Sequence, residues 1–161
     1  GAYASAWAHM EKGPGRMIFN LEDDFLFTRT VDLAEMAAVL AANPYLVQLA
    51  LRRQPWNEVE RAAGGVVEQR PDAFTEVRDG YGRVWLEHRE WLTTNPSLYR
   101  RSLCAMGWPD VPRSEGEFTH YLLRHGTDGV PPDAVRFGYW GSRASGVWCQ
   151  HIGHERVGHG Y

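Results

Sequence analysis

The 161-residue sequence has few cysteines, no long apolar run and no excess of positive charge. No apolar run approaches the roughly 20 residues that a membrane-spanning helix needs, so we expect no membrane span. The net charge of −3 provides no general positive field to attract a nucleic acid or an anionic membrane. Cys104 and Cys149 lie far apart and outside any C-x-x-C motif, which indicates reduced thiols in a cytoplasmic protein. One disulfide between them is the alternative.

The sequence also lacks the common nucleotide-binding and hydrolase motifs. It has no glycine-rich P-loop, no dinucleotide-binding G-x-G-x-x-G and no Ser or Cys in a nucleophile elbow. These absences argue against simple NTPases, dinucleotide-dependent enzymes and α/β hydrolases. The composition, 43% hydrophobic and 23% charged, is typical of a soluble globular protein, and the length suffices for one domain with its own core.

The strongest local signal is an acidic cluster, Glu22-Asp23-Asp24, between two apolar runs. The entering run, 16–21, has the length and the Ile/Phe content of a buried strand. Three adjacent carboxylates cannot continue into a core, because an unpaired buried charge is costly. We therefore expect a strand that ends at Leu21 and carries the acids to an exposed end, where carboxylates suit Mg²⁺ or Mn²⁺. The alternative is a solvated acidic turn.

Hydrophobic periodicity and turn signals predict an α/β fold. Helices are expected at 2–12, 32–42, 98–106 and 114–125, and strands at 16–21, 45–51, 66–70, 74–78, 83–88, 135–140 and 147–152. The succession of strand 16–21, helix 32–42 and strand 45–51 predicts a parallel pair joined by a crossover. Ser114 and Glu117 have the spacing of a capping box at the start of the last helix.

Two further polar clusters precede the tail. Arg52-Arg53 and Trp56 form a polar, aromatic loop after a predicted strand. Glu115 and Glu117 open a helix, where a carboxylate that faces a cleft can act as a general base and one at the capping position is held by the backbone. Seven Trp and seven Tyr are many for this length; aromatic side chains line sugar-binding sites, although core packing is their commoner use.

The tail carries the histidines His151, His154 and His159. His151 directly follows an apolar strand, so its position is well defined, and we expect it to complete a mixed oxygen and nitrogen metal site with Asp24. His154 and His159 lie among glycines and are expected near phosphates or in solvent. A polar terminus without a ligand is the alternative for these histidines.

These segments, in this order, resemble the GT-A nucleotide-sugar glycosyltransferases, family 2 in particular. Ile-Phe-Asn-Leu-Glu-Asp-Asp-Phe at 18–25 is similar to their metal-binding DxD segment, with Asp24 at the essential last position and Glu22 where the first Asp is usual. The stretch 94–101, followed by 107–109 and 114–118, is similar to the strand, turn and acidic helix start that hold the catalytic base of inverting members. His151 is similar to the late histidine that helps to hold the metal in some members.

The resemblance implies one three-layer, GT-A-like α/β domain with a mixed sheet, which moves a sugar from a nucleoside diphosphate sugar to a hydroxyl acceptor. It implies a site for Mn²⁺ or Mg²⁺ with Asp24 as the principal ligand, and Glu22, Asp23 and His151 as the others. Arg100, Arg101 or Arg156 would contact phosphate. Glu115 or Glu117 would be the base, and we prefer Glu115 because the capping position occupies Glu117 with the backbone.

The family normally begins with a β-α-β unit that grips the nucleotide base, and in this chain that unit would precede residue 1. Strand 16–21 would then have an open edge, which a second copy or a partner chain can cover. We therefore expect the 161 residues alone to bind donor weakly and not to transfer sugar. The alternatives from other classes are a non-catalytic carbohydrate- or protein-binding domain and a divalent-metal phosphodiesterase or nuclease.

Overall fold

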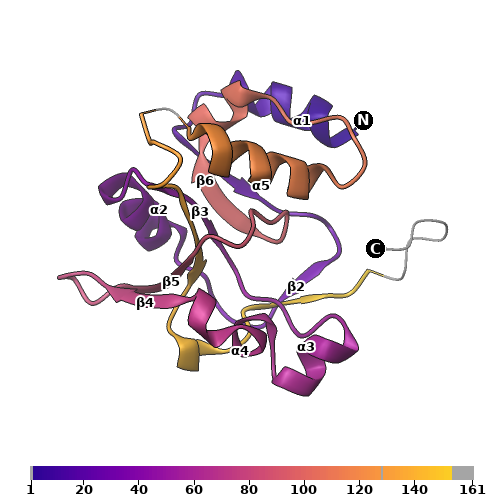
Figure 1. The fold of residues 1–161 in the computed structure, drawn as a ribbon, viewed down its shortest axis with the longest axis vertical. Helices are drawn as coiled ribbons and strands as arrows, with labels where there is room; N and C mark the ends of the chain where they lie inside the picture. The colour runs from indigo at the N-terminus through magenta and orange to yellow at the C-terminus, as the bar shows by residue number, and fades with distance from the viewer. Residues whose placement is uncertain (1, 128, 154–161) are drawn as a thin grey trace.

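A computed structural model describes residues 2–127 and 129–153. Its centre is a mixed six-stranded sheet with the strand order β1-β6-β3-β7-β5-β4 (Figure 1). These strands are β1 (Met17–Asn20), β3 (Leu46–Ala50), β4 (Thr75–Arg78), β5 (Val84–His88), β6 (Ser97–Arg100) and β7 (Arg136–Trp140). A separate two-stranded ribbon pairs β2 (Phe25–Phe27) with β8 (Cys149–His151). The predicted α/β class with a mixed sheet is confirmed.

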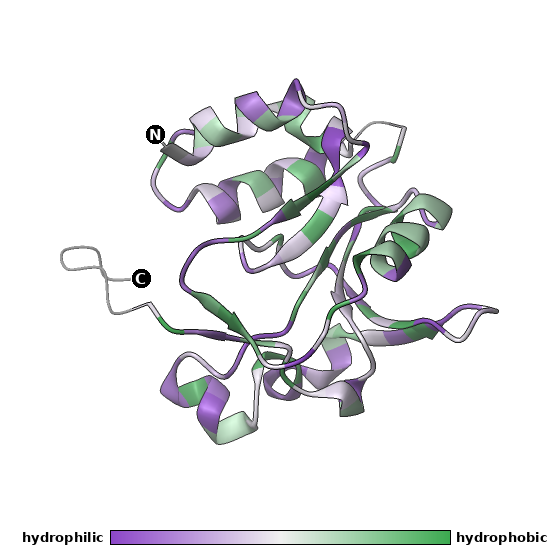
Figure 2. Ribbon diagram, turned by 180° about the vertical axis from the view of Figure 1, so that it is seen from behind, coloured by the Kyte–Doolittle hydropathy of each residue, from purple (hydrophilic) through white to green (hydrophobic). Residues whose placement is uncertain are grey.

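Helices cover both faces of the sheet, because alternate strand residues point to opposite sides. On one face α1 (Ala2–Glu11) and α5 (Ser114–His125) lie side by side, and Trp7 and Phe118 pack there with Val47 of β3. On the other face α2 (Leu33–Ala42) packs against Leu46 and Leu49. The strict alternation is interrupted within β3, whose register against β7 shifts between Leu46 and Gln48. Figure 2 shows largely hydrophobic strands, whereas α1 and α5 alternate hydrophilic and hydrophobic positions. The domain is therefore layered as helix, sheet and helix.

The predicted crossover pair of strands 16–21 and 45–51 is not formed, because β6 lies between β1 and β3. Strand β6 is antiparallel to both, with Tyr99 opposite Ile18 on one side and Gln48 on the other. Strands β1 and β3 consequently run in the same direction, as predicted, but they are not neighbours. Strand β1 is the end strand of the sheet, and no described strand pairs with its outer edge.

Two predicted elements are wrong. Residues 98–106 were expected to be one helix, but Ser97, Leu98 and Tyr99 are buried in succession within β6, and a tight 3-10 helix follows over Arg101–Met106. Pairing with two strands overrides the helical spacing of the apolar residues here. Residues 66–70 were expected to be a strand, but they form the one-turn helix α4 (Val66–Gln69), which buries Val67 after α3 (Glu58–Ala63).

The remaining predicted elements are present with ends that differ by one or two residues. Asp32 caps α2 by accepting hydrogen bonds from the backbone N–H groups of Ala34 and Glu35, as its position before the apolar stripe favours. Cys104 and Cys149 are both buried free thiols, and burial raises the pKa of each to about 11. None of the helices among residues 2–127 and 129–153 is both long and apolar enough to cross a membrane.

Candidate functional site

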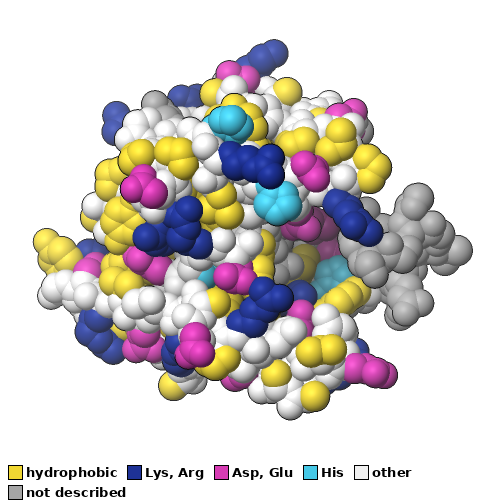
Figure 3. All heavy atoms as spheres, in the orientation of Figure 1, with side chains coloured by type: hydrophobic (Ala, Val, Ile, Leu, Met, Phe, Trp, Pro, Cys, Tyr) yellow, Lys and Arg dark blue, Asp and Glu magenta, His cyan; other side chains and the backbone are white. Residues whose placement is uncertain are grey.

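A cavity of about 530 Å³ opens where the loops after β1 and β3 meet the start of α5. Figure 3 shows the surface hollowed at this level, with acidic and histidine side chains in the hollow. Its walls come from the loop after β1 (Glu22), the start of β2 (Phe25), the loop after β3 (Arg53, Trp56), the α3–α4 region (Glu60, Val66, Gln69, Arg70), residues 91–95, the start of α5 (Glu115, Gly116), and strands β7 and β8 (Tyr139, His151).

The cavity gathers predicted site residues from three distant parts of the chain. Glu22, Glu115 and His151 all line it. Asp24 joins them through an ion pair in which its Oδ2 lies 2.9 Å from Nε2 of His151. Asp23, between the other two acids, is exposed and does not line the cavity. Of the three acids, Glu22 lines the cavity, Asp24 meets it through His151, and Asp23 does not reach it.

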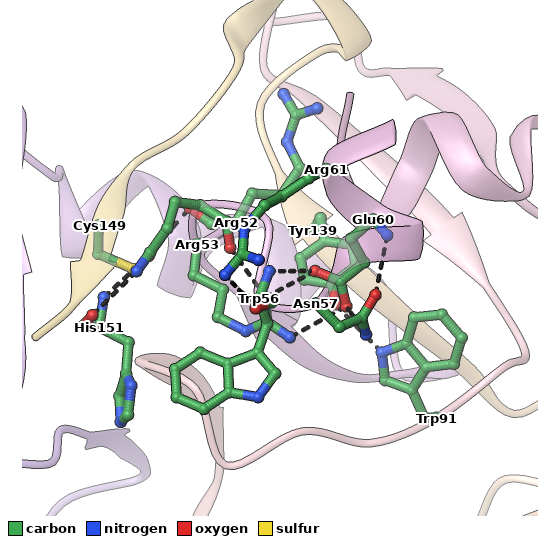
Figure 4. Close-up of polar contacts among 11 residues, drawn as sticks. Arg52, Arg53, Trp56, Asn57, Glu60, Arg61, Trp91, Tyr139, Cys149 and His151 are labelled. Carbon is green, nitrogen blue, oxygen red and sulfur yellow. Dashed lines mark hydrogen bonds and ion pairs between the residues drawn. The ribbon is translucent and has the colours of Figure 1, made fainter. Parts of the chain in front are cut away.

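His151 is held firmly by its surroundings. The side-chain amide of Gln54 accepts from the backbone N–H of His151 and donates to its carbonyl, each at 2.9 Å. Phe25 lies opposite His151 in the β2–β8 ribbon, and its ring meets the imidazole at 4.9 Å between centroids. The indole of Trp56 meets the same imidazole at 4.7 Å (Figure 4). These contacts fix the imidazole toward Asp24.

The residue types at this pair are ones that a divalent cation accepts. Asp24 Oδ1 and His151 Nδ1 are both buried and have no hydrogen-bond partner among the described residues, but Nδ1 is on the opposite edge of the imidazole from the Nε2 that meets Asp24, so an ion shared by the two side chains would have to replace the Oδ2–Nε2 contact. Carboxylate oxygen and imidazole nitrogen are ligands that Mn²⁺ accepts, and Glu22 adds a carboxylate to the same cavity. A Cβ on Gly153 would lie 2.5 Å from Asp24 Oδ2, so glycine at this position leaves room for the carboxylate. Among the described residues, however, no group of three or more candidate ligands is assembled for a metal.

Glu115 is tied to the end of β1 through the backbone of Thr94. The N–H of Thr94 donates to the Glu115 carboxylate, and the Thr94 carbonyl accepts from Asn20 Nδ2 at 2.8 Å. Asn20 is the last residue of β1, and its Oδ1 accepts from the Tyr3 hydroxyl at 3.1 Å. This chain of bonds holds the start of α5 beside the acidic cluster. The Glu115 carboxylate therefore has a backbone partner of its own, in the loop at 93–95.

The predicted capping box is not formed. Helix α5 does begin at Ser114, but the capping position is Arg113, in the left-handed region with φ of 57°, and no side chain caps the helix. Ser114 is already inside the first turn, so its hydroxyl is not in the position from which it caps. Glu117 lines a different hollow, beside Trp108 and His120. Of the two acids only Glu115 faces the cavity that contains Glu22; its role as the base stays a prediction.

The arginines expected at the phosphate lie elsewhere. The guanidinium of Arg100 donates to the carbonyl of Asn43 at the end of α2, at 2.9 Å, and to that of Leu46, the first residue of β3, at 2.8 Å. Arg101 donates to the carbonyl of Gly13. Neither lines the large cavity. Arg156 is outside the described residues, as are His154 and His159, so their roles stay predictions.

Arg53 and Glu60 supply an ion pair in the cavity wall that the sequence did not single out as a pair. The guanidinium donates to both carboxylate oxygens of Glu60, at 2.8 and 3.3 Å, and the backbone N–H of Trp56 donates to the same carboxylate at 2.7 Å. Burial alone raises the pKa of Glu60, but these hydrogen bonds outweigh it and lower that pKa overall. The sequence placed Arg53 near Trp56, but it did not predict that Glu60 bonds to both.

Two further aromatic residues on the cavity wall, Trp91 and Tyr139, belong to no motif that the sequence analysis identified. Trp91 Nε1 donates to the Tyr139 hydroxyl at 3.1 Å, and burial raises the pKa of Tyr139 to about 12 (Figure 4). The ring of His88 stacks on Tyr139, with 5.2 Å between centroids. Only the high aromatic content of the chain hinted at this wall.

Among the described residues, the acids that line the cavity outnumber the arginines by one. Glu22, Glu60 and Glu115 lie there with Arg53 and Arg70, and each arginine has a carboxylate partner: Arg53 with Glu60, and Arg70 with Glu90 at 2.6 Å. A bare anion would be repelled here, whereas a cation, an anion accompanied by a cation, or a neutral polar molecule would not. No family model, curated protein or solved structure matches this chain.

Proposed function

We propose that this cavity carries out metal-dependent glycosyl transfer from a nucleoside diphosphate sugar to a hydroxyl, within a GT-A-like domain. The observation that supports it most is the convergence of Glu22, Glu115 and the Asp24–His151 pair on one cavity, although the chain separates them widely. The DxD-like segment, the acidic helix start and the late histidine were each expected at such a site, and a single cavity joins them.

The residues have distinct roles in this proposal. Asp24, with His151 and Glu22, would hold a divalent cation, which would neutralise the charge of the diphosphate leaving group. Glu115 accepts the proton of the acceptor hydroxyl, since a carboxylate at the rim of such a cavity is placed for general base catalysis. The N–H of Thr94 orients the Glu115 carboxylate by bonding to one of its oxygens. The open edge of β1 is where a second copy or a partner chain would pair.

A non-catalytic carbohydrate-binding domain is the second candidate. Two observations favour it: Asp24 and His151 bond to each other, and residues 2–127 and 129–153 assemble no set of three metal ligands. In that case the acid and the imidazole stabilise the β2–β8 ribbon, and the cavity binds a ligand without changing it.

A thermal-shift screen separates these functions. UDP- and GDP-sugars at about ten times their Kd, with Mn²⁺ present, are expected to raise Tm by about 3–6 °C, the effect of about 1.4 kcal/mol on a domain of this size. The shift should need both nucleotide and metal, disappear in Asp24→Asn and persist in Asp72→Asn, which removes an exposed carboxylate outside the cavity. A shift with metal alone would favour a metal-dependent phosphodiesterase, and no shift would favour the binding domain.

A further inference from the structure

We infer that the acceptor is a neutral carbohydrate, and that it binds against a wall formed by Trp56 and Trp91, here called the indole wall. That the bound sugar is an acceptor rests on the proposed function, but the carbohydrate site itself has independent support. That support comes from the rings, from the ion pair between them and from the charge of the cavity.

The two indoles come from different segments and are both held in place. Trp56 follows β3 and is 37% exposed; the guanidinium of Arg53 lies over its ring at 5.7 Å, and His151 meets it edge-on. Trp91 follows β5, and its Nε1 is bonded to Tyr139. Both line the cavity. Rings fixed before a ligand arrives cost little entropy on binding, and their flat faces suit the C–H faces of a pyranose.

Polar groups lie between the rings. Figure 4 shows Trp56 and Trp91 on either side of the Arg53–Glu60 ion pair. The pair presents guanidinium N–H donors and carboxylate acceptors at the wall of the cavity. A sugar that stacks on the indoles brings hydroxyls that donate and accept to such groups, and hydrogen bonds to charged partners are the stronger kind. Apolar walls with a few placed polar groups are the usual form of a small-molecule site.

The charges of the described residues favour a neutral ligand. Among these residues three carboxylates and two arginines line the cavity, and both arginines are already paired with acids. An acidic sugar or a phosphorylated acceptor would add negative charge beside Glu60 and Glu115, which is unfavourable. An uncharged polyhydroxyl compound meets no such repulsion.

The test measures binding of neutral sugars without donor or metal. A panel of methyl pyranosides and neutral disaccharides is titrated into the chain, with tryptophan fluorescence and ligand-observed NMR as readouts. Concentrations run to ~50 mM, well above the Kd of ~1 mM that corresponds to about −4 kcal/mol. At least one sugar is expected to bind, and Trp56→Ala and Trp91→Ala are each expected to weaken it ~10-fold, equivalent to about 1.4 kcal/mol.

Control variants keep the result interpretable. Tyr81→Ala removes an aromatic ring that is 87% exposed in the β4–β5 turn, outside the cavity, and should leave sugar binding unchanged. Trp56→Phe keeps a smaller ring and should lose less affinity than Trp56→Ala, which separates stacking from misfolding. Binding of no sugar in the panel, or binding that both tryptophan variants leave intact, would overturn the inference.

The two proposals fail in different ways. A metal-dependent nucleotide shift without sugar binding would keep the transferase and reject the indole wall. Sugar binding that depends on both indoles, with no effect of nucleotide or metal, would keep the carbohydrate site and reject the transferase.

Discussion

His88 makes the wall of the cavity sensitive to acid. Its side chain is only 4% exposed and packs among the rings of Phe74, Trp91, Phe137 and Tyr139. Burial among these rings lowers the pKa of His88 from 6.5 to about 3. The folded protein therefore keeps this imidazole neutral, whereas the unfolded chain binds a proton below pH 6.5.

The sign and the size of the effect follow from this difference. Because the unfolded state binds the proton more readily, the free energy of unfolding decreases as the pH falls below 6.5 and continues to decrease toward pH 3. Each pH unit in that window costs up to about 1.4 kcal/mol, so lowering the pH from 7 to 5 should cost ~2 kcal/mol through His88 alone. Against a typical total of about 5–15 kcal/mol this is a large part.

Urea denaturation at pH 7, 6 and 5 measures this cost. The variant His88→Phe keeps a ring that cannot titrate, and it loses the weak bond from the Glu90 N–H to Nδ1 at 3.3 Å. It is therefore expected to be somewhat less stable at pH 7 but to lose ~2 kcal/mol less than the wild type between pH 7 and 5. His120→Gln, which removes an exposed histidine on α5, is the matched control and should keep the wild-type slope.

Glu60 does not affect the comparison between pH 7 and pH 5. The hydrogen bonds that lower the pKa of Glu60 contribute stability that is lost only when the pH falls below the usual carboxyl value of 4.5. If His88→Phe shows the same loss between pH 7 and 5 as the wild type, the reasoning from burial is refuted.

Two other predictions concern the interior and the chemistry. The side chain of Gln48 is 1% exposed and forms hydrogen bonds with both the N–H and the carbonyl of Thr93. Gln48→Leu leaves both Thr93 groups without this partner and should lower the free energy of unfolding by about 2–4 kcal/mol, measured by urea denaturation. In any preparation that turns over, Glu115→Gln should lower kcat by ~10²–10⁴, the usual contribution of a general base, with little change in Tm. Glu117→Gln should leave kcat nearly unchanged, because Glu117 lines a different hollow; the reverse result would reassign the base.

The sequence predicted most strands and long helices because their signals are local. The strand over 45–51 is strongly apolar apart from Gln48, and every residue of β3 is buried. The helix over 114–125 has its predicted bounds. The helix predicted over 98–106 failed because pairing with β1 and β3 on both sides makes Ser97–Arg100 a strand. Such pairing joins residues far apart in the chain, so no local pattern contains it.

The residues of the candidate site likewise divide into those with a local sequence signal and those positioned by contacts between distant segments. Glu22, Asp24 and His151 stand next to apolar strands in the sequence, and in the structure Glu22 and His151 line one cavity while Asp24 contacts His151. Arg100 also follows a strand, but its guanidinium turns to the carbonyls at the end of α2, which is a contact between segments. Glu60 lies on a short helix without an apolar stripe, so its pairing with Arg53 had no periodic signal.

The central claim is that Asp24, Glu22 and His151 hold a divalent cation beside Glu115, and Mn²⁺ relaxation in NMR tests it directly. Low concentrations of Mn²⁺ should first broaden the backbone resonances of Asp24 and His151, two of the proposed ligands, together with that of Gly116, which lines the cavity with His151. The broadening should vanish in Asp24→Asn, weaken in Glu22→Gln and persist in Asp72→Asn. Broadening centred elsewhere, or unchanged in Asp24→Asn, would contradict the account.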